Sequence, residues 1–298
     1  MKNLSFLILG ILSLNIYSQS QNPVVFTTRG TVLEGMSMES ERLKKKINYA
    51  IYLPPGYQNS QRDYPVVYLL HGYTDDESAW IQFGEVHLSA DYAIAERKIP
   101  PMIIVMPDTG VSWYINDIAG KVPYEDMIIQ EFIPFIDETY NTRAEKDFRA
   151  VAGLSMGGYG SLIWSLHHPE IFAACAAFSA AVYTDEEITA MSQDRYQRLF
   201  GNLYVHEDNN KRINAHWKNN SVIELVRKLP ADELEKVRFY IDCGDDDFLY
   251  KGNSTLHMEM RDRNIQHEFR IRNGAHNWTY WRTHIIEGLE FIGESFHR

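Results

Sequence analysis

Residues 153–157 read Gly-Leu-Ser-Met-Gly and fit the pattern G-x-S-x-G, in which a tight turn presents a serine nucleophile. A short, mostly apolar run at 148–152 precedes the pattern, and a helix-like run at 161–166 follows it. Strand, turn and helix in this order are what the pattern requires, because the helix N-terminus then favours negative charge beside the serine. Glycine at 153 and 157 lets strand and helix approach closely. The sequence therefore predicts that Ser155 is a nucleophile at the carboxyl end of a central strand.

A serine nucleophile needs a base that takes its proton and an acid that orients the base. His276 follows the last predicted strand and precedes the closing helix, so it is the predicted base. The acid is expected after the strand that ends near Asp242, where Asp245, Asp246 and Asp247 stand in a row. Position along the chain leaves these three carboxylates as alternatives.

The negative charge that forms on an attacked carbonyl oxygen needs two backbone N–H donors. One is expected from Met156, the residue after the nucleophile. The other is expected from the loop after the apolar run 64–70, where His71, Gly72 and Tyr73 follow. We assign the N–H of Tyr73, with Gly72 as the alternative donor, and take His71 as a structural side chain.

Apolar runs and helical patterns alternate along the chain. Strands are expected over 25–32, 46–53, 64–70, 102–106, 148–152, 172–182, 237–242 and 266–271, and helices over 89–98, 124–140, 161–166, 249–263 and 278–296. The first two strands form an antiparallel edge with a polar turn at 37–46 between them, and the segments 75–83 and 109–123 are expected to be loops. Alternating strands and helices predict an α/β fold, with a mainly parallel sheet and helices on both faces. Residues 184–236 interrupt the alternation and are expected to form a partly helical, cap-like insertion near the active site.

The composition fits one large domain. The chain has 298 residues, of which 45% are hydrophobic, and a formal net charge of -11. That charge argues against nucleic acid and anionic membrane surfaces as partners. No pattern typical of a metal site appears in the sequence, and we expect neither a metal nor a cofactor. The oligomeric state is left open.

The first 20 residues have the features of a signal peptide. Lys2 is followed by an apolar run at 4–12, and Ser18 or Ser20 offers a small residue for cleavage. The run is too short for a membrane span, so we expect an exported protein, periplasmic or secreted, with one domain over 21–298. Export permits a disulfide between Cys175 and Cys243, but both lie in apolar, strand-like runs, which favours buried free thiols.

Five stretches resemble the esterase family that contains esterase D, tributyrin esterases and the feruloyl and acetylxylan esterases of the first carbohydrate esterase family. They are residues 49–57, 68–72, 153–158, 243–250 and 274–281, in the same order along the chain. The resemblance implies the α/β-hydrolase fold and hydrolysis of carboxylic esters. In that family the acid directly precedes Phe-Leu or its equivalent, so the resemblance assigns this role to Asp247.

The resemblance and the expected export favour a secreted carbohydrate esterase of the feruloyl or acetylxylan type, acting on small or polysaccharide-linked esters. Four aromatic residues in or beside the active-site loops are candidate substrate contacts, since rings stack on a cinnamoyl group or a sugar face: Trp80, Trp113, Tyr114 and Trp278. Two alternatives remain open. One is a general short-chain carboxylesterase, lipid acyl hydrolase or siderophore-ester hydrolase, and the other is an acyltransferase like the mycolyltransferases.

Overall fold

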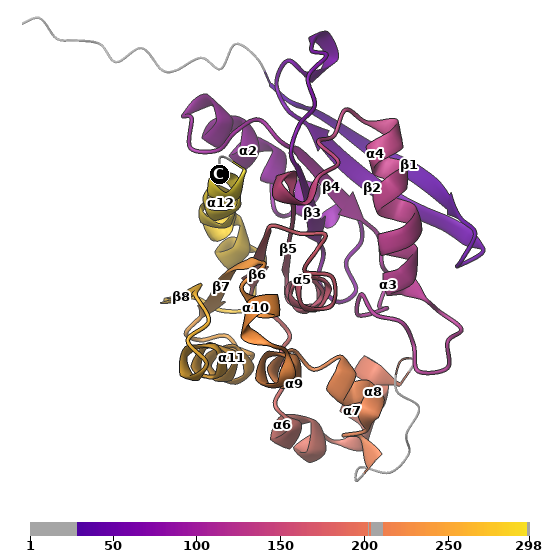
Figure 1. The fold of residues 1–298 in the computed structure, drawn as a ribbon, viewed down its shortest axis with the longest axis vertical. Helices are drawn as coiled ribbons and strands as arrows, with labels where there is room; N and C mark the ends of the chain where they lie inside the picture. Colours follow the sequence, from indigo (N-terminus) through magenta and orange to yellow (C-terminus); the bar gives the residue numbers. More distant parts are fainter. Residues whose placement is uncertain (1–28, 202, 204–210, 297–298) are drawn as a thin grey trace, which may run out of the picture.

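The computed structural model describes residues 29–201, 203 and 211–296 of the chain (Figure 1). The predicted signal peptide at 1–20 and the start of the strand predicted at 25–32 lie outside the described residues.

One eight-stranded sheet runs through the described part of the chain, in the order β1-β2-β4-β3-β5-β6-β7-β8. The strands are β1 (Thr31–Ser40), β2 (Lys45–Leu53), β3 (Val66–Leu70), β4 (Ile103–Pro107), β5 (Arg149–Leu154), β6 (Ala174–Phe178), β7 (Arg238–Gly244) and β8 (His267–Arg272). β1 and β2 pair antiparallel, as do β2 and β4, and the other neighbours pair parallel. The predicted mainly parallel α/β sheet is confirmed. Continuous apolar runs form its centre because those strands are buried on both faces.

Helices cover both faces of the sheet (Figure 1). They are α1 (Ala79–Gln82), α2 (Val86–Ala95), α3 (Tyr124–Met127), α4 (Ile133–Thr139), α5 (Met156–His167), α6 (Asp185–Ala190), α7 (Gln193–Phe200), α8 (Ala215–Asn219), α9 (Val222–Lys228), α10 (Ala231–Leu234), α11 (Tyr250–Asp262) and α12 (Trp278–Ser295), with a π-helical segment η2 (Ile128–Phe132) between α3 and α4 and short 3-10 turns η1 (Tyr57–Asn59) and η3 (Lys146–Phe148). One core lies between the sheet and α2 with α12, and the other lies under α5, η2, α9 and α11.

Parallel pairing brings the functional strand ends to one edge of the sheet. Leu70 at the end of β3 pairs with Gly153 of β5, and Leu154 pairs with Phe178 of β6. Phe178 pairs in turn with Asp242 of β7. The loop after β3, the turn at Ser155 and the loop after β7 therefore emerge side by side, where α/β proteins build their sites.

Two local predictions are wrong. The turn predicted at 37–46 is strand up to Ser40, and the turn itself spans only 41–44, closed by Lys44 with a left-handed φ of 53°. β1 is mostly exposed at the sheet edge, so its polar residues resemble a loop in the sequence. The loop predicted at 75–83 contains the short helix α1, whose Ala79 and Trp80 are buried.

Cys175 in β6 and Cys243 in β7 are buried free thiols. Burial raises the pKa of Cys175 to about 12, so its thiol stays protonated and unreactive. Across the described ranges, none of the helices has both the length and the apolar character needed to cross a bilayer.

The insertion at 184–236 forms α6 to α10, which Figure 1 shows gathered largely at one end of the molecule. A half-buried cluster of titratable side chains joins it to the rest of the fold. Glu125 of α3 accepts hydrogen bonds from His167 Nδ1 and His168 Nε2, both at 2.8 Å. His167 Nε2 lies 2.8 Å from the carbonyl oxygen of Asn219, at the end of α8. Both ring nitrogens of His167 thus face acceptors, which requires a doubly protonated, cationic ring.

This cluster predicts a stability that depends on pH. Burial favours a neutral His167 ring, but the hydrogen bond and charge of Glu125 outweigh it and raise the pKa of His167 above 6.5. The folded state therefore binds this proton more tightly than the unfolded state. Its contribution is full below pH 6.5 and is lost as the pH rises through the raised value. We expect urea unfolding midpoints to fall between pH 6 and pH 9, and to fall less in His167→Gln. An equal fall in both proteins would contradict the cationic ring.

Candidate active site

Ser155 occupies the turn between β5 and α5 in a backbone conformation that non-glycine residues rarely adopt, with φ 54° and ψ −116°. Such a conformation costs about 1–3 kcal/mol, so surrounding bonds must hold it. The Ser155 N–H donates to the Phe178 carbonyl at 2.9 Å. The Ser155 carbonyl accepts from the N–H groups of Tyr159, at 3.0 Å, and Ala181, at 2.8 Å. β6 and the first turn of α5 together fix the serine.

Two glycines make the turn possible because no side chain fits beside it. A Cβ on Gly153 would lie 2.5 Å from the carbonyl oxygen of Gly157. A Cβ on Gly157 would lie less than 3.0 Å from the carbonyl oxygens of Leu70, the last residue of β3, and of His71, which follows it. Both positions of the G-x-S-x-G pattern are therefore set by packing of β5 and α5 against β3.

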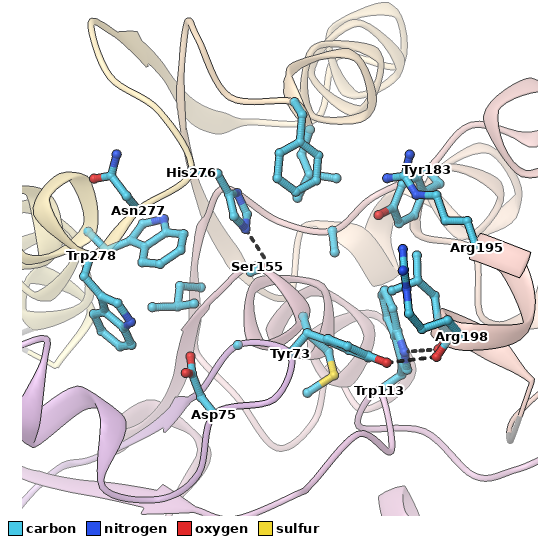
Figure 2. Close-up of a pocket in the computed structure, with 18 residues that line it drawn as sticks. Tyr73, Asp75, Trp113, Ser155, Tyr183, Arg195, Arg198, His276, Asn277 and Trp278 are labelled. Atoms are coloured by element: carbon cyan, nitrogen blue, oxygen red, sulfur yellow. Dashed lines mark hydrogen bonds between the residues drawn. The ribbon is translucent and has the colours of Figure 1, made fainter. Parts of the chain in front are cut away.

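The structure brings Ser155, His276 and Asp247 together. His276 Nε2 lies 2.9 Å from Ser155 Oγ (Figure 2). On the other side of the ring, Nδ1 lies 2.8 Å from Asp247 Oδ2. The carboxylate can only accept, so Nδ1 carries the proton and Nε2 is left to accept from the serine hydroxyl. Asp247 is buried, and its other oxygen accepts from the Leu249 N–H at 2.8 Å.

The other two acids of the row lie elsewhere. Asp245 and Asp246 are exposed. Asp245 Oδ1 accepts from the Gly274 N–H at 2.9 Å, and the Asp246 N–H donates to the Gly274 carbonyl at 2.9 Å. Both contacts hold the loop that carries His276. The geometry selects Asp247 from the three alternatives for contact with the histidine.

The loop after β3 passes beside the serine. A Cβ on Gly72 would lie 3.7 Å from Ser155 Cβ, so the backbone approaches closely there. The Gly72 carbonyl accepts from His71 Nδ1 at 2.8 Å and from the Asp75 N–H at 3.3 Å. Because C=O and N–H point in opposite directions in a trans peptide, the Tyr73 N–H points away from the His71 ring. Tyr73 and Met156 both line the pocket that contains Ser155.

His71, which the sequence predicts to be a structural side chain, holds the peptide that follows Gly72. It is buried, and its Nε2 accepts the Thr109 N–H at 3.0 Å. Since Nε2 accepts, Nδ1 must carry the proton that holds the Gly72 carbonyl. Tyr114 adds a further support, since its hydroxyl donates to the His71 carbonyl at 2.9 Å.

This geometry agrees with what the chain resembles. The family model described as "Putative esterase" matches residues 40–292. The chain belongs to the putative esterase family. An endo-1,4-beta-xylanase/feruloyl esterase of Xylanibacter ruminicola is 36% identical over 163 residues, which are 52% of this chain and 22% of that protein. The chain thus matches only about a fifth of that protein's length.

Two further relatives match over more of their length. An acetyl esterase of Caldicellulosiruptor saccharolyticus is 27% identical over 237 residues, 76% of this chain and 83% of that protein. A ferulic acid esterase of known structure has a TM-score of 0.77 and 29% identity, covering 90% of this chain and 99% of that chain. With the family match, these relatives identify the protein as a carboxylic ester hydrolase with the α/β-hydrolase fold.

The esterase has a cavity of about 640 Å³ over Ser155, a size suited to small organic ligands (Figure 2). It is lined by Gly72, Tyr73, Asp75, Trp113, Leu154, Ser155, Met156, Ala181, Tyr183, Arg195, Arg198, Leu199, Phe248, Leu249, His276, Asn277, Trp278 and Trp281. Burial raises the pKa of Asp75 on its wall. Burial also raises the pKa of Tyr183, and the neighbouring Arg195 partly offsets that effect.

Of the four aromatic residues predicted to contact substrate, Trp113 and Trp278 line this cavity and the other two do not. Trp80 is fully buried, its Nε1 donates to the Leu70 carbonyl at 2.9 Å, and its ring packs edge-on against Trp278. Tyr114 is also fully buried, beneath α5. Both rings are packed inside the protein behind the pocket wall. The prediction that Trp80 and Tyr114 contact substrate directly is therefore wrong.

The pocket also contains residues that the sequence analysis did not single out, chiefly Asp75, Tyr183, Arg195 and Arg198. The two arginines come from α7, inside the insertion. Their spacing of three residues places them on one helix face, but no sequence signal indicated that this face meets the site.

We predict that the Nδ1–H of His71 supports catalysis by holding the Tyr73 peptide. His71→Asn retains a donor near the Nδ1 position, whereas His71→Gln places its amide near Nε2. Losing one oxyanion donor typically lowers kcat by about 10²–10³-fold. We expect about a 10²-fold loss of kcat in the Gln variant, little change in KM, and a much smaller loss in the Asn variant.

Unfolding free energies provide the control for this pair. Each variant loses one buried hydrogen bond, so each should be destabilised by about 1–3 kcal/mol. Equal kcat losses in the two variants would show that His71 acts through packing and not through its Nδ1–H.

Proposed function

We propose that this esterase is an exported serine carboxylesterase of the feruloyl or acetylxylan type, working through an acyl-enzyme. The observation that carries the proposal is the chain of contacts from Ser155 through His276 to Asp247, at the base of a cavity with aromatic walls. The proposal of export rests on the signal-peptide features of residues 1–20.

The proposed reaction begins with transfer of the Ser155 hydroxyl proton to His276 Nε2 as Oγ attacks the ester carbonyl carbon. The resulting oxyanion accepts hydrogen bonds from the N–H groups of Tyr73 and Met156. Collapse of this intermediate breaks the bond to the alcohol, which leaves with the proton from His276. Water then repeats the sequence on the acyl-enzyme and releases the acid. Asp247 stabilises the histidine cation in both halves.

The substrate class follows from the pocket walls and the relatives' names. Trp113 and Trp278 lie on opposite sides of Ser155 in Figure 2. The half-buried Trp278 ring can stack on a cinnamoyl group or a sugar, whereas the Trp113 ring is buried against Phe200. The relatives are named for feruloyl and acetyl ester cleavage. Hydrolysis of methyl ferulate alongside a small acetate ester separates the two acyl groups. Rapid ferulate release would support a cinnamoyl site, and acetate release alone would favour acetylated glycans or small esters.

We predict that Ser155→Ala lowers kcat by about 10⁴-fold or more while leaving the fold intact, because the nucleophile is lost and the rest of the site remains. Steady-state kinetics and circular dichroism check the two parts of this expectation. Ester hydrolysis at the wild-type rate in Ser155→Ala would overturn the proposed nucleophile.

The three neighbouring acids give a matched series for the role of Asp247. We expect Asp247→Asn to lower kcat by about 10³–10⁴-fold, because His276 loses the partner that fixes its tautomer. Asp245→Asn and Asp246→Asn should each change kcat by less than about tenfold, since both side chains are exposed and neither contacts His276. A larger loss in Asp246→Asn than in Asp247→Asn would transfer the role to the neighbouring acid.

A further inference from the structure

Helix α7 places two arginines on the wall of the cavity. Arg195 and Arg198 both line it, three residues apart on one face of the helix. Figure 2 shows their side chains with Tyr183 and Trp113 on one side of Ser155, while Asp75 and Trp278 lie toward the other. The pocket is therefore positively charged at its α7 end and carries a carboxyl group elsewhere.

Neither guanidinium has a counter-charge in the described part of the chain, where no carboxylate oxygen lies within 4.0 Å of either one. Among the described residues some arginines have a carboxylate partner, as Arg149 has Asp137 at 2.7 Å, and others, such as Arg261 on the surface of α11, do not. Two like charges on one helix face repel each other. An anion bound between them would remove that repulsion.

The helix that carries these arginines is fixed to the loops that follow β3 and β4. The Arg198 carbonyl accepts from the Tyr73 hydroxyl at 2.8 Å, and the Leu199 carbonyl accepts from Trp113 Nε1 at 2.8 Å (Figure 2). Ser192 caps the other end of α7. The guanidinium groups therefore extend from a backbone that is held in place relative to Ser155.

We propose that Arg195 and Arg198 form a subsite for a carboxylate on the ester substrate. The proposal rests on the proposed esterase function and narrows its substrate class. A guanidinium matches a carboxylate with two parallel N–H donors, and it stays positively charged at any pH at which the enzyme works. Asp75 lies on the pocket wall away from α7, where its carboxyl group disfavours a substrate anion. The charged end of the substrate is therefore expected to point toward the arginines. The carboxylate belongs either to a dicarboxylic acyl group or to a uronic acid on the alcohol side.

Pairs of esters that differ only in charge test the subsite. For the acyl side, a succinate half-ester is compared with the butyrate ester of the same alcohol. For the alcohol side, the acetylated methyl glycoside of glucuronic acid, with its carboxylate free, is compared with acetylated methyl glucoside. The measured quantity is the ratio of kcat/KM for the anionic ester to that for the neutral ester, and the pair that shows arginine dependence identifies where the carboxylate lies.

The decisive variant is R195Q/R198Q, which keeps the helix backbone and its contacts to Tyr73 and Trp113. We expect the ratio to fall about tenfold, because the anionic ester loses two exposed charged contacts that the neutral ester does not make. Arg261→Gln is the matched control, because Arg261 is an exposed helix arginine of α11 outside the cavity. It should leave the ratio unchanged. An unchanged ratio in R195Q/R198Q for both pairs would overturn the subsite.

A binding measurement separates this inference from the proposed function. Tryptophan fluorescence of the Ser155→Ala variant is titrated with succinate, the methyl glycoside of glucuronic acid and methyl glucoside at constant ionic strength. Tighter binding of a carboxylate that disappears in Ser155→Ala with R195Q/R198Q supports the subsite even if no ester is hydrolysed, in which case only the proposed function fails. Carboxylate binding that is equal with and without the arginines would overturn the subsite even if esters are hydrolysed.

Discussion

The backbone conformation of Ser155 is the constraint on which the rest of the structure depends. A residue other than glycine is held at a φ of 54°, and its N–H and C=O are both bound by neighbouring segments. This conformation requires glycine at 153 and 157 and a close approach of β3. In return it places the hydroxyl at the N-terminus of α5, within 2.9 Å of His276. The sheet, whose central strands are fully buried, holds Ser155 in this strained conformation.

Hydrogen bonds join the insertion to the loops that follow β3 and β4. Tyr73 contributes its backbone to the wall beside Ser155 and its hydroxyl to the end of α7. Trp113, in the loop after β4, also lines the pocket, and its indole Nε1 donates to the Leu199 carbonyl of α7. Because α7 is tied at two points, displacement of the insertion would disturb the peptide that follows Gly72. Substrate contacts on the cap and the geometry at the serine are therefore expected to change together.

The sequence predicted the parts of this structure that follow from local rules. Continuous apolar runs identified the buried strands, and the glycine spacing identified the turn at Ser155. Spacing could not choose among Asp245, Asp246 and Asp247, because that choice depends on a distance of 2.8 Å to His276 across the sheet edge. It could not separate Trp80, which packs behind the site, from Trp278, which lines it. The direction in which a side chain points is set by tertiary packing, which also explains why the pocket arginines were not anticipated.

The central claim is that an acyl group passes through Ser155, and acid-quenched mass spectrometry tests it most directly. The protein is mixed with methyl ferulate, quenched within the first turnover, and digested. The account predicts a feruloyl mass increase on the peptide containing Ser155, which is absent in Ser155→Ala. If methyl ferulate gives no turnover, the same experiment uses the small acetate ester. Ester turnover without an adduct on that peptide, or with an adduct on another residue, would contradict the account.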